Sequence, residues 1–224
     1  MSLEQHNRRI VACTRCRRLV AWRAQVSREK RAAFASETYW GKPVPGFGDP
    51  KARLLVCGLA PAAHGGNRTG RVFTGDRSGD WLYGALYRAG FANQPTSTDR
   101  QDGLRLRDCY VTVGVRCAPP DNKPLPEERD ACLPFLVADL QLLARVRAIF
   151  CLGAFAWDAV LRALRELGHA PSPRPKFGHG VEIAVGPYTL LGSYHVSQQN
   201  TFTGRLTEPM LDAVFQRARA VLDP

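Results

Sequence analysis

The sequence lacks any long run of apolar residues. A membrane-spanning helix needs about 18 of them in succession, and no segment of the 224 residues approaches that length. The first nine residues are polar and contain no apolar stretch typical of a secretory signal. These absences predict a soluble, cytoplasmic protein with no membrane partner.

Acidic residues are scarce relative to basic ones: 20 Asp and Glu against 31 Lys and Arg, for a formal net charge of +11. Such an excess favours a polyanionic partner, because contacts with phosphates release counterions and steer association. Arginine dominates the basic residues and binds phosphate through two parallel hydrogen bonds, although a GC-rich genome also enriches it. Charge alone therefore favours nucleic acid only modestly over a solvated basic surface.

The cysteines are odd in number, seven, and no export signal accompanies them, so a disulfide framework is not expected. Cys13 and Cys16 form a C-x2-C pair, Cys117 follows a predicted strand, and Cys132 lies near the start of a predicted helix. Four thiolates converging on one point could hold zinc or an iron–sulfur cluster, and the spacing does not choose between them. The other three lie on predicted strands and are expected in the core: Cys57, Cys109 and Cys151.

Strand-like and helix-like segments alternate along most of the chain. The predicted strands cover residues 54–57, 109–115, 148–152, 181–185 and 188–191, and the predicted helices cover residues 14–39, 81–89, 133–143, 157–164 and 210–222. This alternation predicts an α/β fold with a mostly parallel sheet between two layers of helices. We expect a single domain over residues 1–224, in which residues 1–50 form a helical N-terminal extension.

A long polar loop, residues 58–76, follows the first strand of this sheet. Five glycines in it permit close backbone approach to a ligand, and polar, charged and aromatic side chains lie between them. Loops of more than about 12 residues are usually functional or disordered, and open α/β sheets bind ligands at the carboxyl ends of their strands. The loop is therefore expected to bind a ligand, with a mobile surface loop as the alternative.

Two further polar loops follow strands. In residues 116–124, prolines could fix Asp121 and Asn122 in position, although a rigid turn would have the same composition. In residues 194–205, His195 is a candidate acid or hydrogen-bond donor among amides and hydroxyls, and a structural histidine is the alternative.

Together these loops resemble the uracil-DNA glycosylase superfamily in its UdgB-type branch, family 5. The three segments that carry the resemblance are GLAPAAHGGNRTGRVFTGDRSGDWL (58–82), VRCAPPDNKP (115–124) and HVSQQNTFTGRLT (195–207), and four cysteines match the family's cluster ligands in order. The resemblance implies a three-layer α/β/α domain with a central, mostly parallel four-stranded sheet. It also implies a structural 4Fe–4S cluster on Cys13, Cys16, Cys117 and Cys132, with zinc at the same cysteines as the alternative.

The implied activity is that of a monomeric, monofunctional glycosylase of base excision repair. It would remove uracil, and in this branch hypoxanthine and xanthine, from double- or single-stranded DNA. The base would be held by Gly58, Leu59 and Ala60 through their backbone, by stacking on Phe73 and by His195. The residues expected to contact DNA are Arg68, Arg71, Ser197, Gln198, Asn200 and Arg205.

The sequence departs from most of the superfamily at the position of the water-activating group. Leu59 and Ala60 are apolar where other branches place an acid or an amide, so the water is assigned to Asn122, with Asp76 in reserve. Val113 and Gly114 stand where some branches carry a base-reading asparagine, which argues against strict selectivity for uracil. Val196 replaces a proline that commonly follows the histidine. Candidates for a wedge that fills the gap left by the flipped base are Asn200, Thr201, Phe202 and Leu206.

Two other function classes remain open from the sequence. One is a non-catalytic nucleic-acid-binding protein held together by a metal, and the other is an iron–sulfur electron-transfer protein. Release of free uracil from DNA would separate the glycosylase from both.

Overall fold

A computed structural model describes residues 1–223 of the chain. The strands are β1 (Phe47–Gly48), β2 (Leu54–Gly58), β3 (Cys109–Val113), β4 (Ala148–Leu152), β5 (Glu182–Val185) and β6 (Tyr188–Ser193). The helices are α1 (Leu3–Val11), α2 (Arg17–Glu29), α3 (Gly66–Thr69), α4 (Arg77–Arg88), α5 (Pro126–Leu142), α6 (Ala154–Glu166), α7 (Gln198–Phe202) and α8 (Glu208–Leu222), with 3-10 turns η1 (Ala32–Phe34) and η2 (Pro120–Asn122). Each helix in residues 1–223 is too short or too polar to cross a membrane.

The strands form one sheet in the order β1-β3-β2-β4-β6-β5. The four central strands are parallel, as the sequence predicts, and β1 and β5 extend the sheet as antiparallel edge strands. The β5 strand returns to β6 through the turn at Gly186 and Pro187. The sequence did not predict β1, because its two residues lie in a Gly- and Pro-rich connector and gain their hydrogen bonds from β3, far along the chain.

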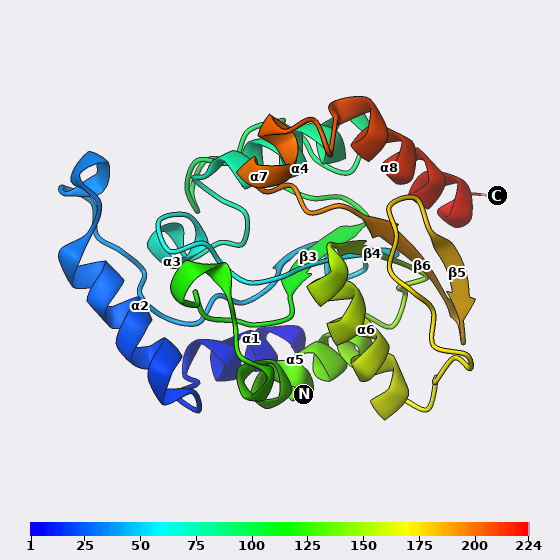
Figure 1. Ribbon diagram of the computed structural model, residues 1–224, viewed down its shortest axis with the longest axis horizontal. Coiled ribbons are helices and arrows are strands. Elements are labelled where there is room, and N and C mark those ends of the chain that lie inside the picture. The colour runs from blue at the N-terminus through cyan, green and yellow to red at the C-terminus, as the bar shows by residue number, and fades with distance from the viewer. Residues whose placement is uncertain (224) are drawn as a thin grey trace.

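Helices cover both faces of the sheet, which confirms the three-layer α/β/α class (Figure 1). Helices α4 and α8 lie on one face, and α1, α5 and α6 lie on the other. Successive residues of a strand point to opposite layers, so Val56 packs in the core beside α4 and α8, whereas Leu55 and Cys57 pack beside α5 and α6. Burial of both faces explains why the central strands are continuous apolar runs.

The N-terminal extension differs from its prediction. A single helix over residues 14–39 was expected, but α2 covers only Arg17–Glu29 and ends where Lys30 adopts a left-handed backbone with φ of 54°. A separate helix, α1, precedes the cysteine pair and is capped by Ser2, whose hydroxyl accepts the Gln5 amide while the Gln5 side chain accepts the Ser2 amide. Helix α1 packs on α5, and α2 packs on α3.

Candidate active site

The three polar loops meet at the carboxyl edge of the sheet. β2 leads into residues 59–76, β3 into residues 114–124 and β6 into residues 194–207. β3 is the neighbour of β2, and β6 is separated from β2 by β4 alone. The Gly114 amide donates to the Gly58 carbonyl at 2.9 Å and joins the first two loops. The Gly153 amide, at the end of β4, donates to the Ser193 carbonyl at 2.8 Å beside the third. The expected convergence at this edge is therefore confirmed.

Phe73 is held in a strained backbone conformation at this edge. Its φ of 50° lies in the left-handed region, which a bulky residue rarely occupies, and the side chain is 7% exposed. The ring lies directly over Gly58, where an added Cβ would come within 2.4 Å of the ring Cζ. Such strain is typical of functional sites, and it fixes an aromatic face beside the end of β2.

His195 lies next to this ring. The two ring centroids are 6.1 Å apart with planes inclined by 37°. Burial lowers the pKa of His195 to about 4, so the imidazole is neutral at pH 7 and can donate one hydrogen bond. Asn200 donates to the His195 carbonyl at 2.8 Å, which fixes the backbone without using the ring. Gly153 leaves room for the side chain, since a Cβ there would lie 3.2 Å from the His195 Cβ.

Asp76 caps helix α4. Its Oδ1 accepts the Gly79 amide at 3.0 Å, and its Oδ2 lies so close to Gly65 that a Cβ there would be 1.8 Å away. Burial raises the pKa of Asp76. The fold therefore uses Oδ1 for capping and packs Oδ2 against the backbone of Gly65.

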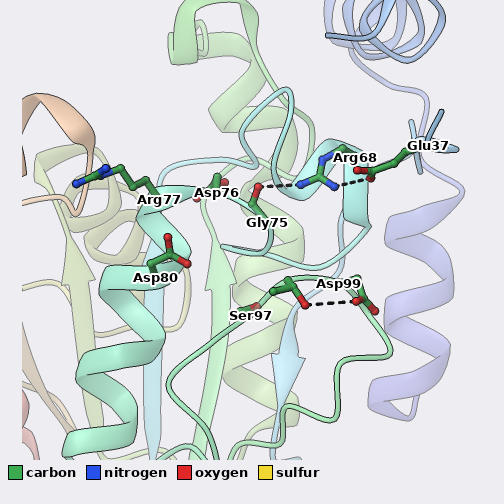
Figure 2. Close-up of a pocket in the computed structure, with 9 residues that line it drawn as sticks. Glu37, Arg68, Gly75, Asp76, Arg77, Asp80, Ser97 and Asp99 are labelled. Carbon is green, nitrogen blue, oxygen red and sulfur yellow. Dashed lines mark hydrogen bonds and ion pairs between the residues drawn. The ribbon is translucent and has the colours of Figure 1, made fainter. Parts of the chain in front are cut away.

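A cavity of about 540 Å³ lies beside Asp76 (Figure 2). Its lining is Glu37, Arg68, Gly75, Asp76, Arg77, Asp80, Ser97, Thr98 and Asp99. Neither Phe73 nor His195 belongs to this lining, so the cavity is distinct from the space between those two rings. Four carboxylates among its residues make it unsuited to a DNA phosphate.

The structure does not place Arg68 and Arg71 where DNA could contact them. Arg68 is 8% exposed, pairs with Glu37 and donates to the Gly75 carbonyl (Figure 2). Arg71 is 4% exposed and pairs with Asp102. Both guanidinium groups hold the first loop together. Their acidic partners are 31 residues away in the chain, so nothing in the local sequence revealed this role.

Asn122 occupies the exposed tip of the second loop. Asp121 and Asn122 have successive left-handed backbones, with φ of 53° and 55°, and both side chains are exposed. Arg18 on α2 donates to the Lys123 carbonyl at 3.2 Å and ties the tip to the extension. The assignment of the water to Asn122 stays a prediction.

The third loop is anchored at both ends in the core. Val196 is 1% exposed and Leu206 is 0% exposed, so Leu206 is not available as a wedge. Between them, Ser197 is the residue before α7 and Gln198 is exposed on it. Phe202 at the end of α7 is 63% exposed, with the Arg77 guanidinium 4.5 Å from its ring centroid. Phe202 is thus the prominent apolar group on this loop.

Leu59 and Ala60 lie between the end of β2 and the cysteines. The Leu59 carbonyl accepts the Val115 amide at 3.0 Å, and Ala60 packs against the cluster of apolar residues that contains the four cysteines. Arg205 stacks over the ring of Tyr194 at 4.6 Å, directly before His195. The Arg205 guanidinium therefore packs on Tyr194, the residue next to His195.

The four cysteines predicted as ligands lie together. Cys117 and Cys132 are buried with Ile10 and Leu19, and Cys13 and Cys16 pack against the same group. Arg23 donates to the Cys117 sulfur at 2.8 Å. Within residues 1–223, no three His, Cys, Asp or Glu side chains converge closely enough to hold one metal ion. The remaining cysteines, Cys57, Cys109 and Cys151, are fully buried in the sheet as predicted.

A buried polar network beneath these cysteines was missed by the sequence analysis. Asp139 of α5 is 0% exposed, accepts from Arg116 at 2.5 Å and from Thr112 at 2.7 Å, and bonds His6 of α1 at 3.0 Å. Burial alone would raise the pKa of Asp139, but Arg116 and these hydrogen bonds hold it below its usual value. Two residues could have indicated this network: Thr112, a polar residue within the apolar strand β3, and Asp139, a charged residue on the buried face of α5.

Comparisons with known proteins agree with this geometry. A family model of the uracil DNA glycosylase superfamily matches residues 45–219. A type-5 uracil-DNA glycosylase of Mycobacterium tuberculosis is 54% identical over 220 residues, covering 97% of this chain and 81% of that protein. Its namesake from Thermus thermophilus is 50% identical over 220 residues, covering 98% of each chain. The type-5 uracil-DNA glycosylase of Pyrobaculum aerophilum is 46% identical over 212 residues, covering 95% of this chain and 90% of that protein. The chain therefore belongs to the uracil DNA glycosylase superfamily.

Proposed function

We propose that the protein is a type-5 uracil-DNA glycosylase that hydrolyses the N-glycosidic bond of uracil in DNA during base excision repair. The observation that carries this proposal is the pairing of a strained Phe73 ring with a neutral His195, 6.1 Å apart between centroids at the carboxyl edge of the sheet. The relatives described above carry this activity in their names.

Base binding follows from the first loop. A glycosylase acts on a nucleotide rotated out of the duplex and held in a pocket. The face of Phe73, which lies over Gly58, offers a stacking platform. Backbone amides at Gly58, Leu59 and Ala60 would hydrogen-bond the base edge. Stacking does not discriminate among bases, because every base has a π-face.

His195 supports departure of the base. As the N-glycosidic bond breaks, its electron pair passes to the base and the sugar becomes cationic. A neutral imidazole N–H that faces the developing negative charge stabilises it, and it requires no reorganisation because the ring is already fixed. The low pKa of His195, about 4, keeps the imidazole neutral at physiological pH.

A water molecule then adds to the sugar carbon and loses a proton to solvent or to the departing base. Because Leu59 and Ala60 are apolar, they cannot orient this water. Asn122 is our first choice to do so, and the Asp76 carboxylate is the second. The water-positioning residue would therefore lie outside the start of the first loop.

The range of substrates extends, in this proposal, to hypoxanthine and xanthine. Val113 is 1% exposed, and a Cβ on Gly114 would lie 3.0 Å from Phe155, so neither residue offers a side chain that hydrogen-bonds specifically to uracil. We further propose that the enzyme acts as a cytoplasmic monomer on double- or single-stranded DNA.

We propose that Cys13, Cys16, Cys117 and Cys132 hold a structural 4Fe–4S cluster. Their common apolar surroundings support this assignment, as does the Arg23 guanidinium beside Cys117, which would offset thiolate charge. Zinc held by the same four thiolates is the alternative. The bound cluster would supply a crosslink between the N-terminal extension and the loop after β3.

Release of free uracil tests the proposal. A duplex with one labelled uracil should lose that base on incubation with the protein and retain an unbroken strand with an abasic site. His195→Ala should reduce excision far more than DNA binding. Binding of the duplex by the wild-type protein with every base left attached would refute the enzyme and favour the non-catalytic binding protein.

A further inference from the structure

Basic side chains gather at the amino edge of the sheet, opposite the candidate active site. They line a second cavity, of about 390 Å³, whose residues are Asp49, Lys51, Arg53, Arg107, Asp108, Arg145 and Arg219. We call these residues the amino-edge cluster. They directly precede β2, β3 and β4 or lie on α8, whose end is near the C label in Figure 1.

The two carboxylates of the amino-edge cluster are already engaged. Asp108 accepts from the amide and the Nε of Arg53, at 2.9 and 2.8 Å. Asp49 accepts the amides of Lys51 and Asp108, at 2.8 and 2.9 Å. These carboxylates thus shape the strand ends and neutralise Arg53.

Three cations of the cluster are left without such partners. Lys51, Arg107 and Arg145 are exposed, and within residues 1–223 none of them forms an ion pair with an acidic side chain. Like charges gathered around one cavity repel each other. An anion seated among them would relieve that repulsion, and guanidinium groups match phosphate through paired hydrogen bonds.

The amino-edge cluster cannot serve the DNA strand that enters the active site. The central strands β2, β3 and β4 have five residues each, which separates the two sheet edges by about 17 Å of strand at roughly 3.3 Å per residue. The loops at each edge add to this separation. A duplex engaged at the carboxyl edge therefore leaves the amino-edge cluster facing away from it.

We propose that the amino-edge cluster binds the sugar–phosphate backbone of a second DNA duplex while the carboxyl edge engages the first. Only the identity of the first duplex rests on the proposed function. Contacts to phosphates without base contacts carry no sequence information, so the second duplex needs no damaged base. A protein that holds two duplexes can transfer directly from one DNA segment to another without first dissociating into solution.

The test is the stoichiometry of the complex with undamaged 12-base-pair duplexes in excess, measured by sedimentation velocity at low salt. The wild-type protein should bind two duplexes. The triple variant Lys51→Gln, Arg107→Gln, Arg145→Gln should bind one. A control triple that removes the same charge from other exposed arginines, Arg9→Gln, Arg17→Gln, Arg28→Gln, should still bind two.

The affinity for the second duplex gives a quantitative measure. Each lost phosphate contact lowers the slope of log K against log salt by about 0.9, so the first triple variant should lose nearly three units of slope and weaken second-duplex binding more than about tenfold. Excision of uracil from one short duplex should be unchanged in this variant.

Three results would overturn the proposal. One is a wild-type complex limited to one duplex. Another is an equal loss of affinity for the second duplex in the two triple variants, which would mean that the loss depends on net charge and not on the amino-edge cluster. A third is binding of inorganic tripolyphosphate at the cluster with no second duplex, which would assign the cavity to a small phosphorylated ligand. Failure of the wild-type protein to release uracil would instead refute the proposed function. The number of duplexes bound per protein would still test the proposal for the amino-edge cluster.

Discussion

Replacement of Gly58 by alanine should displace the ring of Phe73. The added Cβ would lie 2.4 Å from the ring Cζ and 2.8 Å from Cε2, whereas carbon atoms in contact are about 3.5–4.0 Å apart. The ring must therefore move by roughly 1 Å or more. It has little freedom to do so, because its left-handed backbone, with φ of 50°, is fixed by the loop.

Both stability and activity should respond. Overpacking of this kind costs about 1–3 kcal/mol of unfolding free energy, and a misplacement of about 1 Å at a reacting centre costs on the order of 100-fold in rate. Single-turnover excision of uracil and urea denaturation would measure the two effects. Gly84→Ala on α4 is the matched control, since the nearest atom to its added Cβ is the end of the Arg88 side chain at 3.4 Å.

A double-mutant cycle with Phe73→Ala isolates the mechanism. Once the ring is gone, Gly58→Ala should cost little further activity, because nothing remains to clash with the new methyl group. The reasoning fails if Gly58→Ala excises uracil within about threefold of the wild-type rate, or if its loss adds in full to that of Phe73→Ala.

Five further outcomes are expected. Excision should stay constant from pH 8 to about 5 and fall near pH 4, the pKa of His195; a midpoint near 6.5 would exclude its neutral-donor role. Since the unfolded histidine takes up a proton below about 6.5 and the folded one does not, unfolding free energy should drop from pH 6.5 to 4, less so in His195→Gln. Cys117→Ala should abolish a visible absorption band that Cys151→Ala retains, and a band surviving in both would refute the cluster assignment. Phe202→Ala should slow excision from duplex DNA roughly tenfold, as loss of one stacking contact implies, and an unchanged rate would remove it as the wedge. Asp139→Ala should lower unfolding free energy by about 3–5 kcal/mol in urea, because Arg116 is left charged and buried; a loss below about 1 kcal/mol would contradict this.

The sequence predicted those parts of the fold whose residues signal locally. The apolar runs at the four central strands and the helical spacing in α6 and α8 were sufficient to predict a parallel sheet between two helical layers. Helix α1 was overlooked although Ser2 and Gln5 form a recognisable capping pair, because its polar surface resembles a disordered terminus. The β1 strand could not be predicted, since its hydrogen bonds come entirely from β3.

The site was predicted to a similar extent. Convergence of three loops followed from their positions after parallel strands, and this placed Phe73 and His195 on one edge. The roles of Arg68 and Arg71 were not predictable, because an arginine in a glycine-rich loop has the same local sequence whether it meets solvent or a distant carboxylate. Proximity of the four cysteines required the resemblance, since spacing alone left their arrangement open.

The hydrogen bond between His6 and Asp139 has a consequence for synthesis of the protein. The two residues are 133 positions apart, and a ribosome adds about 5–20 residues per second. Helix α1 therefore leaves the ribosome about 7 to 27 s before its partner on α5 exists. For most of that interval Cys13 and Cys16 have no neighbouring Cys117 or Cys132, which precede Asp139 by only a few tens of residues or fewer. Helix α1 is thus made well before α5 and is among the last elements to reach its final position.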